Sequence, residues 1–112
     1  MQPVTNDATT ALLRAVRAQF QAGQTLRFEE IRSRSWASAT FAGARHELTF
    51  TVEGAEAAEA AMAFVETLES AEFNLRGHIL ADIALVSQHS ECAADGAALV
   101  RMAIEALTVE SG

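Results

Sequence analysis

Residues 45–73 carry the clearest pattern of hydrophobic and polar positions in this chain. Residues 47–53 alternate between polar side chains and hydrophobic ones, which are Leu48, Phe50 and Val52. A period of two is typical of a strand that buries one of its faces. Gly54 interrupts this alternation, and the hydrophobic positions after it lie three or four residues apart. The stretch therefore predicts a strand that is followed directly by a helix.

The helix predicted after Gly54 presents its apolar residues as one stripe, which comprises Ala58, Ala61, Met62, Val65 and Leu68, with Phe64 at its edge. Its opposite side carries the acidic residues Glu56, Glu59, Glu66 and Glu69. An amphipathic helix of this kind buries its stripe against a sheet and leaves its charged side in water. We interpret the acidic side as a solvated surface.

An earlier helix is predicted from Asp7 to Ala22. Its apolar stripe comprises Leu12, Leu13, Val16 and Phe20. Thr5, Asn6 or Asp7 can cap its first turn, because their side-chain oxygens accept hydrogen bonds from backbone amides. Gly23 is placed to end the helix with a left-handed residue.

The chain after this helix reads as extended, but its hydrophobic positions change parity. Leu26 and Phe28 share one parity, whereas the other parity is followed by Ile31, Ala37, Ala39 and Phe41. We therefore expect a bulge or break between Glu30 and Trp36.

A tight turn at residues 42–45, where Gly43 can adopt a positive φ, joins this stretch to the strand after it as an antiparallel hairpin. A third alternation over Ile79–Leu85 predicts another strand. A polar loop is expected from Ser87 to Gly96, with Asp95 and Gly96 as a turn signal.

Residues 97–110 fit two patterns. As a helix, the segment has an apolar stripe of Leu99, Val100, Ala103, Ile104 and Leu107. As a strand, it places on one parity Val100, Met102, Ile104, Ala106 and Thr108. The spread of β-branched residues and the preceding Asp-Gly signal favour the strand.

With a strand at the end, the elements follow the order αββαββ. We expect an α+β fold, a two-layer sandwich related to the ferredoxin-like arrangement, with both helices on one face of a mostly antiparallel sheet. A terminal helix would instead leave three strands and could cover the second face. The length of 112 residues fits a single α+β domain over 1–112, with a flexible N-terminal tail at 1–6.

The chain is acidic, with a formal net charge of −7 and a pI near 4.8. This charge argues against nucleic acid and against anionic membranes, because both are bound through clustered cations. All eight basic residues are arginine, a bias that we attribute to genome composition and take to suggest a bacterial source.

The single cysteine, Cys92, excludes an internal disulfide, and neither a signal peptide nor an apolar span is visible. We expect a cytoplasmic protein without a cofactor.

Four arginines make one part of this acidic chain locally basic, and they are the candidate ligand-binding residues Arg27, Arg32, Arg34 and Arg45. Arginines in such a cluster can bind a phosphate or a carboxylate through paired hydrogen bonds. The alternative is that they form ordinary surface ion pairs with neighbouring glutamates.

The candidate catalytic residues are His46, His78 and Asp82. His78 and Asp82 share one strand face but lie about 13 Å apart, so they cannot form a dyad alone. His46 can approach them if its strand is a neighbour in the sheet. We expect no metal site, because the one close pair of ligand types, His89 and Cys92, lacks a second pair.

The run RHELTFTVEGAEAAEAAMAFVETL is similar to the strand and helix of the pterin-4a-carbinolamine dehydratases, small αββαββα proteins. That resemblance implies an active-site His-His-Pro motif directly after the helix. Residues 73–78 read FNLRGH here, with neither the paired histidines nor the proline. We therefore carry no activity across.

Apolar residues on the second face of the strand at 79–85 suggest a partner that covers them. We hypothesise a non-catalytic binding or assembly module that self-associates, as a homodimer, with Leu80 and Val86 as interface residues. The alternative is a small enzyme or ligand-binding domain whose pocket is lined by the candidate histidines, Asp82 and arginines, with an unknown small-molecule ligand.

Overall fold

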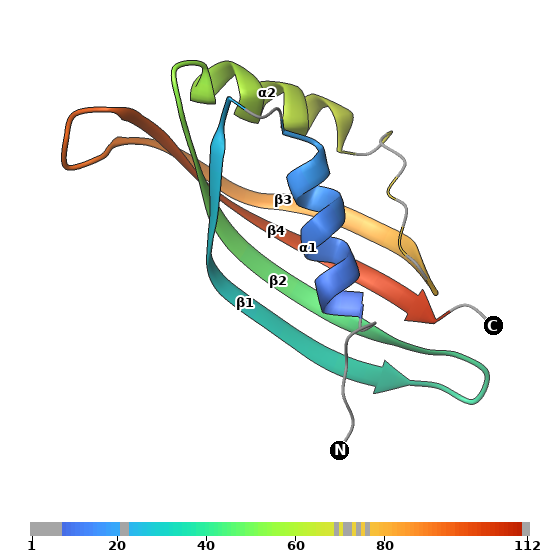
Figure 1. Cartoon of the computed structure of the whole chain (residues 1–112). Coiled ribbons are helices and arrows are strands. Elements are labelled where there is room, and N and C mark those ends of the chain that lie inside the picture. Colours follow the sequence, from blue (N-terminus) through green and yellow to red (C-terminus); the bar gives the residue numbers. More distant parts are fainter. Residues whose placement is uncertain are drawn as a thin grey trace.

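Four long strands form one antiparallel sheet, and two helices pack against it (Figure 1). The computed structural model describes residues 8–20, 23–68, 70, 73, 75 and 77–110. The elements in chain order are α1 (Ala8–Ala18), β1 (Thr25–Ala37), β2 (Ala42–Glu53), α2 (Ala57–Thr67), β3 (His78–Cys92) and β4 (Ala98–Glu110). The predicted α+β class is confirmed. The tail expected at 1–6 lies outside the described residues.

The strands lie in the order β1-β2-β4-β3, so that two hairpins meet along the central pair of β2 and β4. The ambiguous last segment is thus a strand, as we favoured. It becomes an interior strand because its even-numbered residues between 100 and 108 are apolar or hydroxyl-bearing and face the helices, and all five of them are buried: Val100, Met102, Ile104, Ala106 and Thr108.

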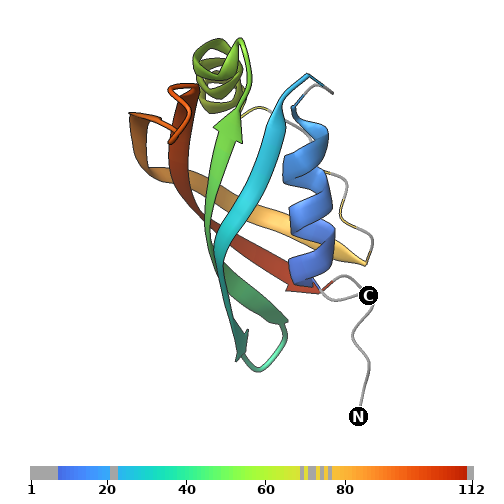
Figure 2. The same cartoon turned by 60° about the vertical axis from the view of Figure 1, so that its left-hand side comes forward.

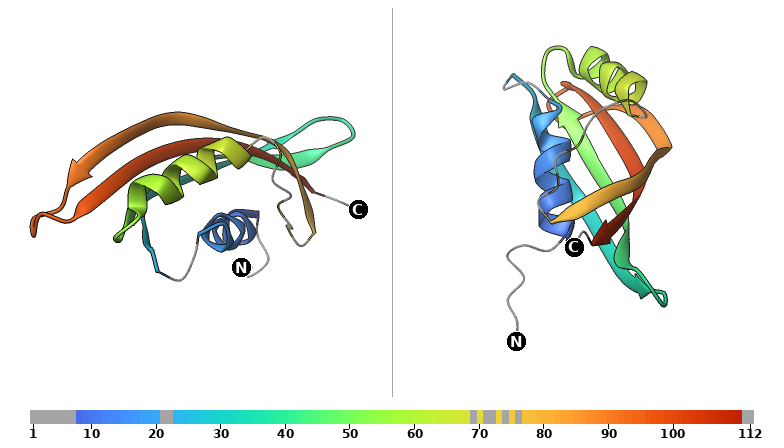
Figure 3. Two further views of the ribbon diagram at one scale, coloured as in Figure 1. Left: turned by 90° about the horizontal axis from the view of Figure 1, so that it is seen from above. Right: turned by 90° about the vertical axis from the view of Figure 1, so that its right-hand side faces the viewer.

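Both helices lie on the same, concave side of the curved sheet (Figure 3). We call this the helix face, and we call the opposite, convex side the outer face, which neither helix covers. The hairpin of β1 and β2 reaches past the beginning of α1 (Figure 2). Among the described residues, no helix is long and apolar enough to cross a membrane.

The core on the helix face is built around four phenylalanines from four different elements or their ends. The ring of Phe50 on β2 is fully buried, 6.0 Å from the ring of Phe64 and 5.6 Å from that of Phe28. The ring of Phe20, just after α1, lies 5.0 Å from Phe64. These tilted and edge-on contacts suit aromatic quadrupoles and join both helices to the sheet.

The buried stripe of α2 differs from the one predicted. Its members lie at steps of four, three and four residues: Ala57, Ala61, Phe64 and Leu68. Phe64 therefore lies at the centre of the stripe, and Met62 is 59% exposed. The reason is non-local, because the phenylalanine cluster fixes how the helix is rotated and a flexible methionine is the residue left in water.

The first helix is shorter than predicted. It ends at Ala18, and the next two amides bond to carbonyls three residues back, at Val16 and Arg17. Tight bonds of this kind are common in the last turn of a helix. The predicted boundaries Asp7 and Ala22 lie outside the described residues.

Three bulges adjust which side chains face the core. In β1 the register shifts between Phe28 and Glu30, slightly earlier than predicted, so that Ile31 lies opposite Leu48. In β3 the register shifts between Leu80 and Asp82 and again between Leu85 and Ser87. An extra residue in one strand reverses the facing of the residues beyond it.

The strand β3 extends well beyond the predicted residues. The segment from Ser87 to Cys92, which we expected to be a loop, pairs with β4 as far as Ala98. Its polar residues are tolerated because β3 is an edge strand with much of its surface in water. The turn lies at residues 93–97, where the Asp95 carboxylate accepts a hydrogen bond from the Ala97 amide.

Gly43 lies on β2 between β1 and β4, in close contact with both strands. Trp36 pairs with it on one side and Val109 on the other. A Cβ atom at Gly43 would overlap the carbonyl oxygen of Thr108 and lie 2.9 Å from Trp36 Cζ2. Glycine is therefore required here for close approach.

We expect Gly43→Ala to destabilise the protein by about 1–3 kcal/mol, because β2 must move away from β4 to admit the methyl group. Urea denaturation measures this difference. Gly23→Ala is the matched control, since a Cβ there meets no atom within 4 Å. Equal stability of the two variants would contradict the close packing at Gly43.

Candidate functional site

An apolar row crosses the outer face at one end of the sheet. Strand registers place Trp36 beside Gly43, Gly43 beside Val109, and Val109 beside Ile79. The side chain of Ile79 is 56% exposed, and Trp36 and Val109 are half-buried. We call these four residues the apolar row.

The next two rows of the outer face are charged, and their signs separate across the sheet. The second row runs across all four strands as Arg34, Arg45, Leu107 and Asp82. The third row runs as Arg32, Glu47, Glu105 and Ala84. The β1 and β2 half is therefore mainly basic, and the β4 and β3 half is acidic.

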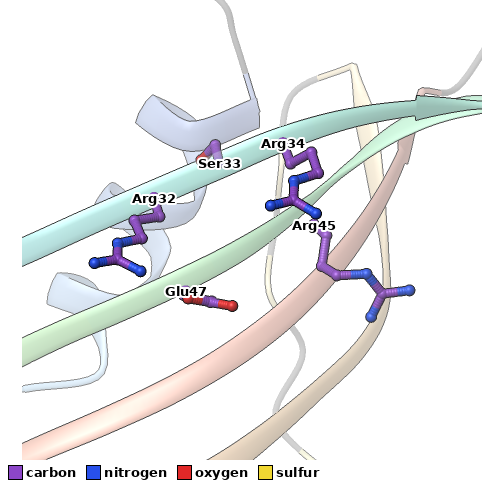
Figure 4. A pocket seen from close by; sticks show the side chains of 5 residues that line it. All are labelled: Arg32, Ser33, Arg34, Arg45 and Glu47. Atoms are coloured by element: carbon purple, nitrogen blue, oxygen red, sulfur yellow. The ribbon is translucent and has the colours of Figure 1, made fainter.

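Three of the four predicted arginines line one shallow pocket on the outer face. The pocket, of about 180 Å³, is formed by Arg32, Ser33, Arg34, Arg45 and Glu47 (Figure 4). Arg32 also forms a salt bridge with Glu30 at 2.7 Å. The fourth arginine, Arg27, lies elsewhere, opposite Thr51.

Arg34 and Arg45 lie directly opposite each other on β1 and β2. Neither forms an ion pair with any residue in the described part of the chain. Like charges in directly opposed positions of a sheet are unfavourable. The ordinary surface pairing that we weighed as an alternative therefore holds for Arg32 but not for these two residues.

Arg101 joins three strands at the other end of the outer face. Its guanidinium donates to both carboxylate oxygens of Glu29 on β1, at 2.9 and 3.1 Å, and also to Glu91 on β3. It passes over Thr51 of β2, which is 2% exposed. Sequence reasoning missed this network, because Glu29 and Arg101 are 72 residues apart.

The hydrogen bonds from Arg101 hold the pKa of Glu29 below its ordinary value of 4.5, and they outweigh partial burial, which acts in the opposite direction. The same bonds raise the pKa of Arg101. Paired charges of this kind are stronger than isolated surface pairs because the contact is bidentate.

His46 lies on the helix face and is fully buried. Its Nδ1 is 2.8 Å from Ser33 Oγ, and its Nε2 is 2.9 Å from Thr108 Oγ1. Ser33 Oγ is in turn 2.7 Å from Thr9 Oγ1 on α1. We call these four residues the hydroxyl–imidazole chain, and it links α1 to β1, β2 and β4.

The structure does not bring the predicted catalytic residues together. β4 lies between the strands of His46 and His78, and Asp82 lies on the outer face, away from the buried His46. His78 instead lies opposite Glu110 and lines a cavity on the helix face. The structure therefore does not form the predicted site that combines Asp82 with His46.

The two predicted interface residues have different surroundings. Leu80 lies opposite Thr108, is partly buried and packs against the core, so its expected place on the second face is wrong. The bulge at Ala81 is the reason, because it brings Leu80 and Ile83 to the same face. Val86 is 57% exposed and lines a small pocket on the outer face.

The one close pair of metal-ligand types in the sequence, His89 and Cys92, lies on β3. His89 and Cys92 are exposed strand residues and not parts of a loop. Within the described ranges, no group of three or more His, Cys, Asp or Glu side chains could hold a metal ion.

No protein-family model matches this sequence, and no significant match was found among curated proteins.

The stability that Glu29 contributes should depend on pH. Because the pKa of Glu29 is lower in the folded protein, its contribution is present above about pH 4.5 and is lost as the pH falls through the lowered value. We expect Glu29→Gln to be less stable than wild type at pH 7, with the difference shrinking in acid. Thermal unfolding between neutral and acidic pH measures this, and a difference that does not change with pH would contradict it.

Proposed function

We propose that this protein is an assembly module that forms a homodimer through the outer face of its sheet. The observation that carries the proposal is the apolar row, which crosses all four strands on a face that neither helix covers. Exposed apolar surface that is bordered by charged residues is typical of an interface. Ile79 replaces Leu80 as a proposed interface residue, and Val86 remains one.

The charges beside the apolar row favour a second copy as the partner. Arg34 and Arg45 lie on the β1 and β2 half, whereas Asp82 and Glu105 lie on the other half. A two-fold axis between the halves brings the arginines of one copy against the acids of the other. Two-fold interfaces use the same patch on both subunits, so such a patch must be complementary to itself.

The proposal has two further parts. The relation of the fold to the ferredoxin-like arrangement is supported by two successive units of a helix and a hairpin that share one sheet. A cytoplasmic location is supported by the single cysteine, which is usual where thiols stay reduced.

Replacing Ile79 and Val86 by glutamate should give a folded monomer, because each of the two copies would bury two new charges at the interface. Light scattering after size exclusion measures the mass, and circular dichroism checks the fold. Met62→Glu is the matched control, since Met62 is as exposed as these residues but lies on α2. The proposal fails if wild type is a monomer, or if the folded double variant stays a dimer.

A second candidate function is binding of an oxyanion, either a phosphate or a carboxylate, in the pocket of Arg32, Arg34 and Arg45. Its specific support is the opposed pair Arg34 and Arg45, which has no acidic ion-pair partner in the described part of the chain. Guanidinium groups bind both anions through paired hydrogen bonds, so an anion would relieve their repulsion.

Titration with inorganic phosphate and with acetate, followed by NMR of backbone amides, should give saturable shifts around Arg34 and Arg45. We expect Arg45→Gln to weaken phosphate binding at least about tenfold, the cost of one charged hydrogen bond. Arg27→Gln is the control, because Arg27 is a β1 arginine outside the pocket. Shifts that do not saturate, or an equal effect of both variants, would exclude this function.

A further inference from the structure

The hydroxyl–imidazole chain combines a buried base with an exposed hydroxyl. His46 has no exposed surface, whereas Ser33 lies on the edge strand β1 and is exposed. Their ring nitrogen and hydroxyl oxygen are 2.8 Å apart. A nucleophile within hydrogen-bond reach of a base, with that base oriented by a third group, is the arrangement that activates serine.

The hydrogen bonds are compatible with an imidazole that carries its proton on Nε2. Thr108 Oγ1 donates to the carbonyl oxygen of Ala44, at 3.3 Å, so it can accept from His46 Nε2. In this tautomer, Nδ1 has a lone pair directed at Ser33, and the Ser33 hydroxyl can donate to it.

The same reasoning extends to α1. In the same tautomer the single hydrogen of Ser33 Oγ is directed at His46, so Thr9 is the donor in the bond between Thr9 and Ser33. Ser33 Oγ thus gives its proton to a base and receives a hydrogen bond from Thr9. The Thr9 hydroxyl also stays close to any charge that develops beside Ser33 during a reaction.

A cavity gives a small molecule access to Ser33. It has a volume of about 310 Å³ and lies on the helix face between the first turn of α1 and the sheet. Its walls include Thr9, Ser33, Ser35, His78 and Glu110. This volume is at the lower end of the range of ligand pockets, and the polar walls suit a short acyl group more than a long aliphatic chain.

We propose that Ser33 is a nucleophile that accepts the acyl group of a small ester, with His46 as its general base. Ser33 Oγ bonds to the carbonyl carbon while its proton passes to His46 Nδ1. The ester bond then breaks, and the leaving alkoxide takes that proton from His46 and departs as an alcohol. Water, deprotonated by the same nitrogen, then attacks the acyl carbon. The bond between Ser33 Oγ and the acyl group breaks, Ser33 takes the proton back from His46, and the carboxylic acid is released.

This activity goes beyond the proposed assembly function and does not depend on it. The hydroxyl–imidazole chain is on the helix face, whereas the apolar row is on the outer face. A protein that stays monomeric can still be labelled at Ser33, and a protein that is not labelled can still form a dimer. Failure of the assembly proposal is therefore distinguishable from failure of the activity proposal.

The test uses a fluorophosphonate ester, whose phosphorus is attacked by an activated serine with loss of fluoride. Intact mass and peptide mapping of the full chain should show one adduct, on Ser33. We expect Ser33→Ala to abolish it. Ser90→Ala is the matched control, because Ser90 is an exposed serine on β3 that does not line this cavity. It should label at the wild-type rate.

His46→Gln tests the general base, and we expect it to slow labelling about 100-fold, the lower range of general-base catalysis. If this variant does not fold, Thr108→Val replaces it, because it removes the acceptor that holds the proton on Nε2. Hydrolysis of p-nitrophenyl acetate provides a second readout of the same serine. The proposal is overturned if wild type is not labelled, if labelling persists in Ser33→Ala, or if a folded variant at His46 or Thr108 reacts at the wild-type rate.

Discussion

The antiparallel pairing of β2 with β4 is the interaction on which the rest of the structure depends. It joins two hairpins that are remote in sequence, and its register places the even-numbered residues of both strands on the helix face. Those residues include Phe50 and Met102, which lie opposite each other at the centre of the core. A shift of one residue would move this whole set into water, so burial of the core fixes the register.

The same register determines both candidate sites. Because side chains alternate, the odd-numbered residues of β2 and β4 form the middle of the outer face, between Arg34 on β1 and Asp82 on β3. On the helix face, the pairing brings Thr108 next to Ala44 and within reach of His46. The apolar core and the hydroxyl–imidazole chain are therefore successive parts of one buried surface, and α1 packs against both.

Sequence patterns predicted what depends on local periodicity. The strand at 98–110, the pairing of β1 with β2 as a hairpin and the grouping of three arginines all follow from neighbouring residues. The turn of this hairpin lies at residues 38–41 and not at the predicted 42–45, because Gly43 is a strand residue without a positive φ. The facing of Leu80 could not be predicted, because a bulge in β3 is only defined by its pairing with β4. The burial of Phe64 in place of Met62 depends on the rings of Phe20 and Phe50, which lie just after α1 and on β2. The contacts of Ser33 with His46, and of Glu29 with Arg101, likewise need strands that the chain brings together only on folding.

Sedimentation equilibrium of the wild-type chain measures self-association through the outer face. We expect a mass that rises from one chain to two over the micromolar range. We also expect high salt to weaken the dimer, because the arginines of one copy face the acids of the other. A mass of one chain at every concentration and salt level would contradict the proposed dimer.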